Sequence, residues 1–187
     1  EMLTNLAGTK ISKLADVKCR ANWMWAAKQP GEGALLFDAA VAMSDLMVAL
    51  GIAIDGGKDS LSMVTKVGEG LVVSPGELVV LGYAPVSDIT KVVTPDLKGG
   101  GSLGFIDLGG GKNRLGGSAL AQALGQLGDD CPDIDDPDLL KRAFEAVQTL
   151  VAEGLVTAYH DRSDGGLLTT VAEMCMAGNR GAFLQLP

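Results

Sequence analysis

The hydrophobic positions of this chain follow two periods, one typical of helices and one of short strands. Helical spacing recurs in residues 34–50, 137–153 and 167–177. The first of these segments is apolar on nearly every side, which predicts a helix that is largely buried. The second has one apolar stripe, is expected to be capped by Asp136, and ends before Gly154.

Shorter apolar runs bounded by glycine, proline or charged residues predict strands. They occupy residues 52–54, 71–74, 77–84, 102–108, 156–159 and 182–186. The Pro-Gly pair at 75–76 predicts a hairpin between the second and third of them, and residues 117–127 read as one more helix. The first half mixes helices with a hairpin and the second alternates strand and helix, so we predict an α+β fold in two pieces, 1–98 and 99–187.

Composition and charge exclude several classes of function. The chain has 187 residues, of which 47% are hydrophobic and 4% aromatic, so its core must rest on small and aliphatic side chains. A net charge of -8 argues against a general nucleic-acid or anionic-membrane binder, although a nucleotide can still bind through a bridging cation. Three scattered cysteines predict neither disulfides nor a zinc site, and a reducing, cytoplasmic setting is expected. No apolar run is expected to reach membrane-spanning length.

One polar stretch, residues 159–166, has the composition of a phosphate or metal site. It contains the single histidine His160, the carboxylates of Asp161 and Asp164, a serine and two glycines before a predicted helix. Glycines allow backbone N–H groups to approach an anion, and carboxylates can hold a bridging cation. The simpler interpretation is a strand-to-helix turn in which Ser163 or Asp164 caps the helix, and these residues alone favour that one.

Three further features are open to both a functional and a structural interpretation. Residues 55–63 are expected to form a loop after the strand at 52–54. They repeat the pattern of paired glycines followed by charge and hydroxyl, but their spacing is not that of a Walker A loop. At the amino end, Glu1 and Asn5 lie four apart and share one helix face, which in isolation is best explained as an exposed helix end. Trp23 and Trp25 are expected in the core.

Taken together, six stretches resemble the phosphoribosylformylglycinamidine synthase family in its own order along the chain. They are residues 1–7, 21–26, 57–63, 94–97, 115–122 and 160–167. The resemblance implies a fold of repeated units like aminoimidazole ribonucleotide synthetase. This chain would cover the later part of an N-terminal-type subdomain and the early part of a C-terminal-type subdomain in the second repeat. It would be a piece of a longer protein whose other domains, the glutaminase domain included, are its partners.

The activity that the resemblance implies is an ATP- and glutamine-dependent ligase of purine biosynthesis. Such a ligase converts formylglycinamide ribonucleotide to formylglycinamidine ribonucleotide, with Mg2+ and ATP or ADP as bound groups. The family's magnesium ligands fall on Glu1, Asn5 and Asp161, the last expected from the opposite subdomain, and a nucleotide contact falls on Ser163. Candidate substrate or phosphate contacts are Lys58 and Ser60; the catalytic residues are not identified, and His160 is given no role.

Two questions stay open at the level of sequence. The nucleotide could react or could be a structural one that stabilises a subdomain interface, and related selenophosphate, thiamine-phosphate or aminoimidazole ribonucleotide enzymes share the fold. The stretches at 22–26 and 57–63 favour the amidotransferase over those relatives. As an isolated piece the chain is expected to be inactive, and exposed strand edges predict self-association.

Overall fold

The computed structural model describes residues 1–185, which form two compact units. We call one the sheet unit; it consists of Met2 and Ser12–Pro85. We call the other the helical unit; it consists of Glu1, Leu3–Ile11 and the described residues from Val86 onward.

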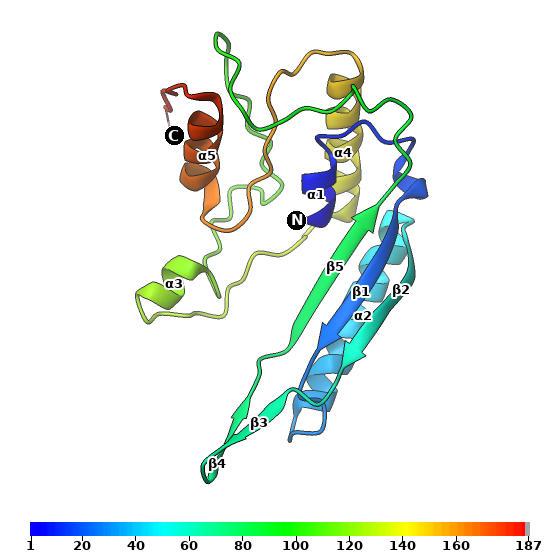
Figure 1. The fold of residues 1–187 in the computed structure, drawn as a ribbon, viewed down its shortest axis with the longest axis vertical. Helices are drawn as coiled ribbons and strands as arrows, with labels where there is room; N and C mark the ends of the chain where they lie inside the picture. The colour runs from blue at the N-terminus through cyan, green and yellow to red at the C-terminus, as the bar shows by residue number, and fades with distance from the viewer. Residues whose placement is uncertain (186–187) are drawn as a thin grey trace. The chain divides into compact units, whose positions relative to one another are not determined.

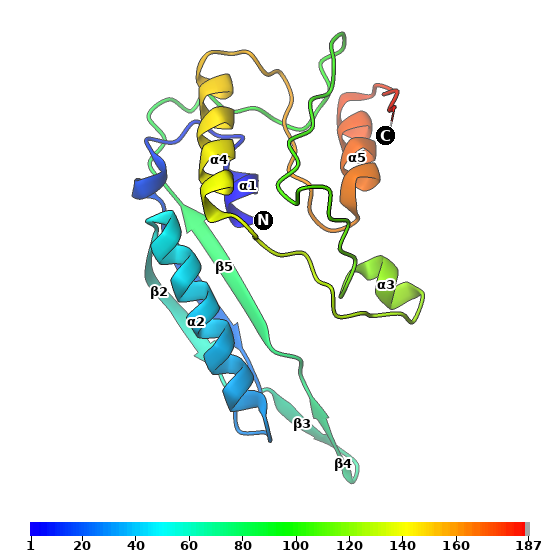
Figure 2. The same ribbon diagram turned by 180° about the vertical axis from the view of Figure 1, so that it is seen from behind.

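The sheet unit is built on three strands in the order β2-β1-β5. The central strand β1 (Lys18–Met24) pairs in parallel with β2 (Ala53–Ser60) and antiparallel with β5 (Glu77–Tyr83). A 3-10 turn, Leu14–Asp16, precedes β1. Helix α2 (Glu32–Leu50) connects β1 to β2 and runs along one face of the sheet (Figures 1 and 2).

The core of the sheet unit follows the two-residue period of β1. Cys19, Ala21 and Trp23 alternate with more exposed residues and are buried, as is Trp25 just beyond the strand. The Trp25 ring packs so closely on Gly76 that a Cβ there would lie 2.4 Å from a ring carbon. The prediction that both tryptophans belong to the core is confirmed.

The predicted hairpin around residues 75–76 is wrong. The hairpin instead joins β3 (Val64–Val67) to β4 (Gly70–Val73), and its turn contains Gly68 in a left-handed conformation. Residues 75–76 lead from β4 to β5, which pairs with β1. Gly76 is needed because the Trp25 ring packs against it. In the sequence, a glycine required by this distant contact cannot be told from a glycine required by a turn.

The predicted loop that begins at residue 55 is also wrong, because residues 53–60 form one continuous strand. The register with β1 shifts there: Cys19 pairs with Ile54 and Arg20 with Gly56, so Asp55 is the extra residue of a bulge. At Gly57 φ is 149°, and a Cβ would lie 1.8 Å from the carbonyl oxygen of Ala21. The paired glycines thus permit a close approach of two backbones.

Helix α2 has the predicted position but not the predicted burial. Among its residues only Leu50 is buried, and large side chains such as Phe37 and Val48 are exposed. A helix that is apolar on every side needs cover that one sheet face does not supply. By length and composition α2 could cross a membrane, so the expectation that no apolar run reaches that length is wrong; core helices of globular proteins pass the same test.

Four helices belong to the helical unit. They are α1 (Met2–Leu6), whose residues from Leu3 onward lie in this unit, α3 (Ala119–Ala123), α4 (Pro137–Ala152) and α5 (Gly166–Gly178). Asp136 caps α4 as predicted, accepting from the backbone N–H groups of Asp138 and Leu139. Buried side chains of α4 at Leu140, Phe144, Val147 and Val151 form the predicted stripe, and α5 buries Val171 and Met174.

Other predictions for this part of the chain are corrected. Residues 102–108, 156–159 and 182–185 contain no strand, while residue 186 lies outside the described residues. An extended segment becomes a strand only where a neighbour supplies hydrogen bonds, and within the described part of the helical unit the one such pairing is the bridge between Thr9 and Val92. The helix expected at 117–127 is limited to α3, since Gly125 adopts a left-handed conformation.

The α+β class is confirmed by the mixture of helices and strands. The proposed subdomains 1–98 and 99–187 stay a prediction. Contacts divide the chain differently, because Leu3–Ile11 packs with the residues that follow Val86. In consequence Asn5 and Asp161 belong to one compact unit. The expectation that Asp161 comes from the opposite subdomain stays a prediction together with the subdomain bounds.

Candidate functional site

Two of the three proposed metal ligands meet in the helical unit. The amide nitrogen Nδ2 of Asn5, on α1, lies 3.5 Å from the carboxylate Oδ1 of Asp161. Asn5 is exposed, whereas Asp161 is only 7% exposed. The pair therefore lies at the protein surface, with the acid on its buried side. The 156 residues that separate them in sequence make this a long-range contact.

The carboxylate of Asp161 has few partners within the protein, and both of them are on one oxygen. Its other close neighbour is Nδ1 of His160 at 3.4 Å, again on Oδ1, and within residues 1–185 no hydrogen bond or ion pair reaches Oδ2. A buried carboxylate normally has strong partners, because desolvation is costly. The free oxygen of Asp161 and the amide oxygen of Asn5 are hard donors of the kind that Mg2+ prefers.

Glu1 is the N-cap of α1 and is not joined to the pair. Its backbone oxygen accepts from the N–H of Asn5 at 2.8 Å and from the hydroxyl of Thr4, and its side chain is exposed. Among the described residues there is no cluster of three or more histidine, cysteine, aspartate or glutamate side chains that could hold a metal. A cation at Asp161 would therefore need ligands beyond such side chains, such as the Asn5 amide, water or phosphate.

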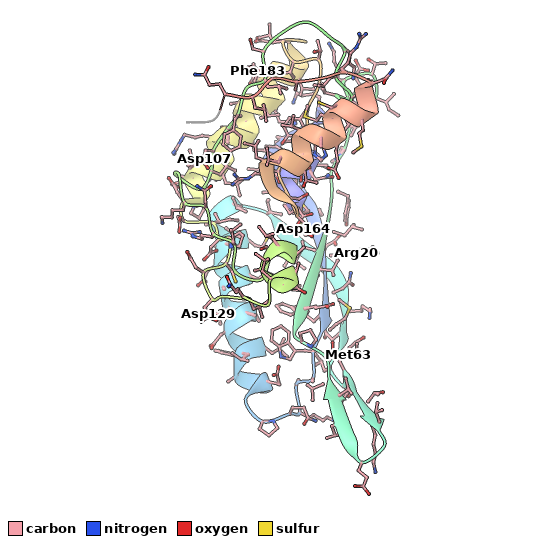
Figure 3. All side chains as sticks on the ribbon, turned by 90° about the vertical axis from the view of Figure 1, so that its left-hand side faces the viewer. Arg20, Met63, Asp107, Asp129, Asp164 and Phe183 are labelled. Atoms are coloured by element: carbon pink, nitrogen blue, oxygen red, sulfur yellow. The ribbon has the colours of Figure 1, made fainter. Side chains whose placement is uncertain are left out.

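Ser163 and the paired glycines form the entrance to α5. The predicted cap by Ser163 or Asp164 is wrong: the N-cap is Gly165, with φ of 87°, and no side chain caps the helix. Asp164 lies beside the start of α5 (Figure 3) and accepts from the N–H of Gly165. The carbonyl of Ser163 accepts from Gly166, and its hydroxyl takes no part in this turn. Uncapped N–H groups at a helix start favour an anion.

Gln148 fixes the segment that follows α1. Its Nε2 donates to the carbonyl oxygens of Ala7 and Thr9 at 2.9 and 2.8 Å, and its Oε1 accepts from the N–H of Ile11 at 2.9 Å. The side chain comes from α4 and is buried. A single amide thus satisfies three backbone groups next to the helix that carries Asn5. The sequence analysis missed this residue, because a glutamine within an apolar stripe looks like an exposed position.

Tyr159 connects the segment that carries Asp161 to α1. Its hydroxyl donates to the carbonyl oxygen of Thr4 at 2.6 Å, and its N–H donates to Thr94. Its ring packs on Gly8, where an added Cβ would lie 2.9 Å from the ring. Burial, with a smaller contribution from the Asp161 charge, raises the pKa of Tyr159 to about 12.

This raised pKa makes the helical unit sensitive to alkali. Because the folded pKa lies above the unfolded value of about 10, the neutral phenol contributes stability below pH ~10 that is lost as pH rises through about 12. We expect the free energy of unfolding to fall between pH 10 and 12 in the wild type. In Tyr159→Phe the decline should be smaller over the same range. Denaturant unfolding at pH 9, 10 and 11 measures both, and equal slopes for the two proteins would contradict the expectation.

His160, which was given no role, is held between two carboxylates. Its Nε2 lies 3.0 Å from Oε2 of Glu173 on α5, and its Nδ1 faces Asp161. Glu173 is a second residue that the sequence analysis missed. The sequence does contain a sign of it: Glu173 is the one charged residue of α5, thirteen residues after the histidine.

The candidates Lys58 and Ser60 lie on β2 of the sheet unit. They are two residues apart and point to the same side of the strand, and Lys58 Nζ donates to the Ser60 hydroxyl at 2.8 Å. Lys58 lines an open cavity of about 320 Å³ together with residues of β1, β2 and α2, among them Ala21, Met43 and Gly57. The structure places these two candidates together and does not test their role.

Comparisons with known proteins cover both ends of the chain. Residues 1–85 match the model of the FGAR-AT PurM_N-like domain, and residues 106–187 match the AIR synthase related protein, C-terminal domain. Proteins named phosphoribosylformylglycinamidine synthase align with the entire chain at 57% identity in Arabidopsis thaliana, 54% in Dictyostelium discoideum and 53% in Homo sapiens. The plant protein's name adds the words "probable" and "chloroplastic/mitochondrial". The chain spans only 13% to 14% of the length of these relatives.

Solved structures with a related arrangement are more distant. The T. maritima PurL complexed with ATP is 16% identical over 92% of this chain and 24% of its own, with a TM-score of 0.46. The E. coli HypE, a hydrogenase maturation protein, is 17% identical over 95% of this chain and 51% of its own, with a TM-score of 0.48.

Proposed function

Because this chain belongs to the phosphoribosylformylglycinamidine synthase family, we propose that it contributes a magnesium-nucleotide site to such a ligase. In that enzyme ATP and glutamine would drive conversion of formylglycinamide ribonucleotide to formylglycinamidine ribonucleotide. The single observation that carries the proposal is the meeting of Asn5 with the buried Asp161, whose Oδ2 is free. A cytoplasmic location and a glutaminase partner domain are parts of the same proposal.

Three residues would hold Mg2+ in this proposal: Glu1, Asn5 and Asp161. Glu1 and Asn5 share a face of α1, and the Asp161 oxygen is available near Asn5. A bound Mg2+ would neutralise charge on the phosphates of ATP or ADP. The Ser163 hydroxyl and the uncapped start of α5 would contact the same phosphates.

A second candidate function is a structural nucleotide site that does not turn over. It is favoured by how firmly the site's elements are fixed to one another, through Gln148 and through the bond between Tyr159 and Thr4. A nucleotide held there would stabilise the fold by mass action even without reacting. Retention of ADP through many turnovers of the complete enzyme would favour this second function, and exchange at the turnover rate would favour the first.

The proposal is tested by calorimetry with ADP, with and without Mg2+. We expect binding that requires the metal, and we expect Ser163→Ala to weaken it by roughly tenfold through loss of one hydrogen bond to a charged group. Thr149→Ala, which removes an exposed hydroxyl from α4, serves as the matched control. Binding of ADP that is indifferent to Mg2+, or no binding at all, would refute the proposal.

Lys58 and Ser60 would contact the ribonucleotide substrate or a phosphate. We expect Ser60→Ala to raise the KM for the ribonucleotide by roughly tenfold, because a hydrogen bond to a charged group is lost. The KM for ATP should stay within about twofold, and Thr65→Ala on the exposed strand β3 should change neither constant. The measurement is steady-state kinetics of the complete enzyme, and an unchanged ribonucleotide KM would remove Ser60 from the site.

A further inference from the structure

The side chain that connects α5 to the candidate site is His160. Its ring is 18% exposed and spans the distance between Oε2 of Glu173, at 3.0 Å, and Oδ1 of Asp161, at 3.4 Å. The same Asp161 oxygen faces the Asn5 amide. These contacts form one line from α5, through the imidazole, to the carboxylate and on to α1.

The two carboxylates that His160 contacts differ in how firmly the backbone around them is held. Glu173 lies in the third turn of α5, whose buried residues Val171 and Met174 anchor that stretch of helix. Asp161 lies in a segment without regular structure, four residues before the first of two left-handed glycines. The contact through the His160 ring therefore lets the anchored helix α5 hold the loop that carries Asp161, and the loop does not hold the helix.

The contacts also select which Asp161 oxygen stays available. Both His160 and Asn5 approach Oδ1, at 3.4 and 3.5 Å, so the two contacts lie on the same oxygen and Oδ2 is left over. A carboxylate held in this way presents one oxygen to a ligand in a single orientation. Residues that orient a metal ligand typically affect metal affinity about 10- to 100-fold.

We propose that Glu173 is a positioning residue for the metal site: through His160 it fixes the orientation of the Asp161 carboxylate. This inference rests on the proposed function, since it takes Asp161 as a metal ligand. Glu173 itself does not touch the cation. Its role requires the length of its side chain and a polar group that hydrogen-bonds to Nε2 of His160, whereas its negative charge is not needed.

The test uses two substitutions at Glu173 that separate geometry from charge. Glu173→Gln keeps the length and a side-chain amide that can hydrogen-bond to the His160 ring but removes the charge, and Glu173→Asp keeps the charge but shortens the side chain by one methylene. We measure the Kd of Mn2+ in the presence of ADP by electron paramagnetic resonance on the protein. We expect Glu173→Gln to stay within threefold of wild type, and Glu173→Asp and Glu173→Ala to weaken Mn2+ by roughly tenfold.

Three further variants keep the result interpretable. Met176→Ala, on the same helix at a position that is 73% exposed, should leave the Kd unchanged. His160→Ala should weaken Mn2+ as Glu173→Ala does, and the double variant should be no worse than either single one. Melting temperatures are measured alongside, and a loss of affinity that follows the melting temperature across all variants would overturn the inference.

The failure of this inference is distinguishable from failure of the proposed function. If Asp161→Asn leaves the Mn2+ Kd unchanged, the metal site itself is wrong, and the role of Glu173 falls with it. If Asp161→Asn weakens Mn2+ while Glu173→Ala and Glu173→Asp do not, the site stands and only the positioning role is overturned. Loss of affinity in Glu173→Gln equal to that in Glu173→Ala would show that charge matters and would likewise overturn it.

Discussion

Gln148→Met is expected to lower the free energy of unfolding of the helical unit by about 3 kcal/mol or more. Methionine is close to glutamine in length but cannot hydrogen-bond as glutamine does. The change leaves the carbonyls of Ala7 and Thr9 and the N–H of Ile11 without their partner in a buried place. Each unpaired buried group costs roughly 1–3 kcal/mol. Chemical denaturation followed by circular dichroism provides the measurement.

A matched control is available in the same unit. Gln122 donates a single bond, from Nε2 to the carbonyl of Gly117, and it is exposed. Gln122→Met should therefore change the free energy of unfolding by less than about 0.5 kcal/mol. A loss below about 1 kcal/mol for Gln148→Met would mean that water replaces the amide and that the segment after α1 is not fixed by α4.

Asp161→Asn is expected to weaken magnesium-dependent ADP binding at least tenfold, or about 1.4 kcal/mol. Asparagine has nearly the same shape, so the contact with Asn5 can persist, but it offers the cation a neutral oxygen in place of an anionic one. The free energy of unfolding without metal should be unchanged or higher, because a buried carboxylate with two long contacts is costly. If Asp161 is a metal ligand, the substitution lowers ADP affinity without lowering the free energy of unfolding. If Asp161 only stabilises the fold, the free energy of unfolding falls.

Asp164→Asn is the control for this substitution. Asp164 lies three residues away, is exposed, and accepts a local bond from Gly165. Its replacement removes the same charge from the same loop and should change ADP affinity by less than about twofold, since exposed charges are screened. Equal losses in both variants would attribute the effect to the general negative charge of the loop.

The elements that were predicted correctly are those whose signals are local. Helix α4 was predicted with its cap at Asp136 and its apolar stripe, because capping and amphipathic spacing act within a few residues. Trp23 was placed in the core on the strength of its size and low polarity. The family resemblance gave the pairing of Asn5 with Asp161, which no local pattern contains.

The elements that were missed depend on distant partners. Gly57 looked like part of a loop, but the backbone of Ala21 is what requires a glycine there. Residues 156–159 have strand-like composition and yet no strand partner, and Tyr159 serves instead to bind Thr4. Gln148 looked like a polar interruption of a stripe, until its three bonds appeared across more than 130 residues of sequence.

The most direct test of the metal site is anomalous X-ray diffraction from a crystal of the protein grown with Mn2+ and ADP. We expect one anomalous peak within about 2.0–2.3 Å of both Asp161 Oδ2 and Asn5 Oδ1, with phosphate oxygens completing its ligands. Glu1 should supply a further oxygen to the same ion. Bound ADP with Mn2+ elsewhere, or a peak that touches neither Asn5 nor Asp161, would contradict the account.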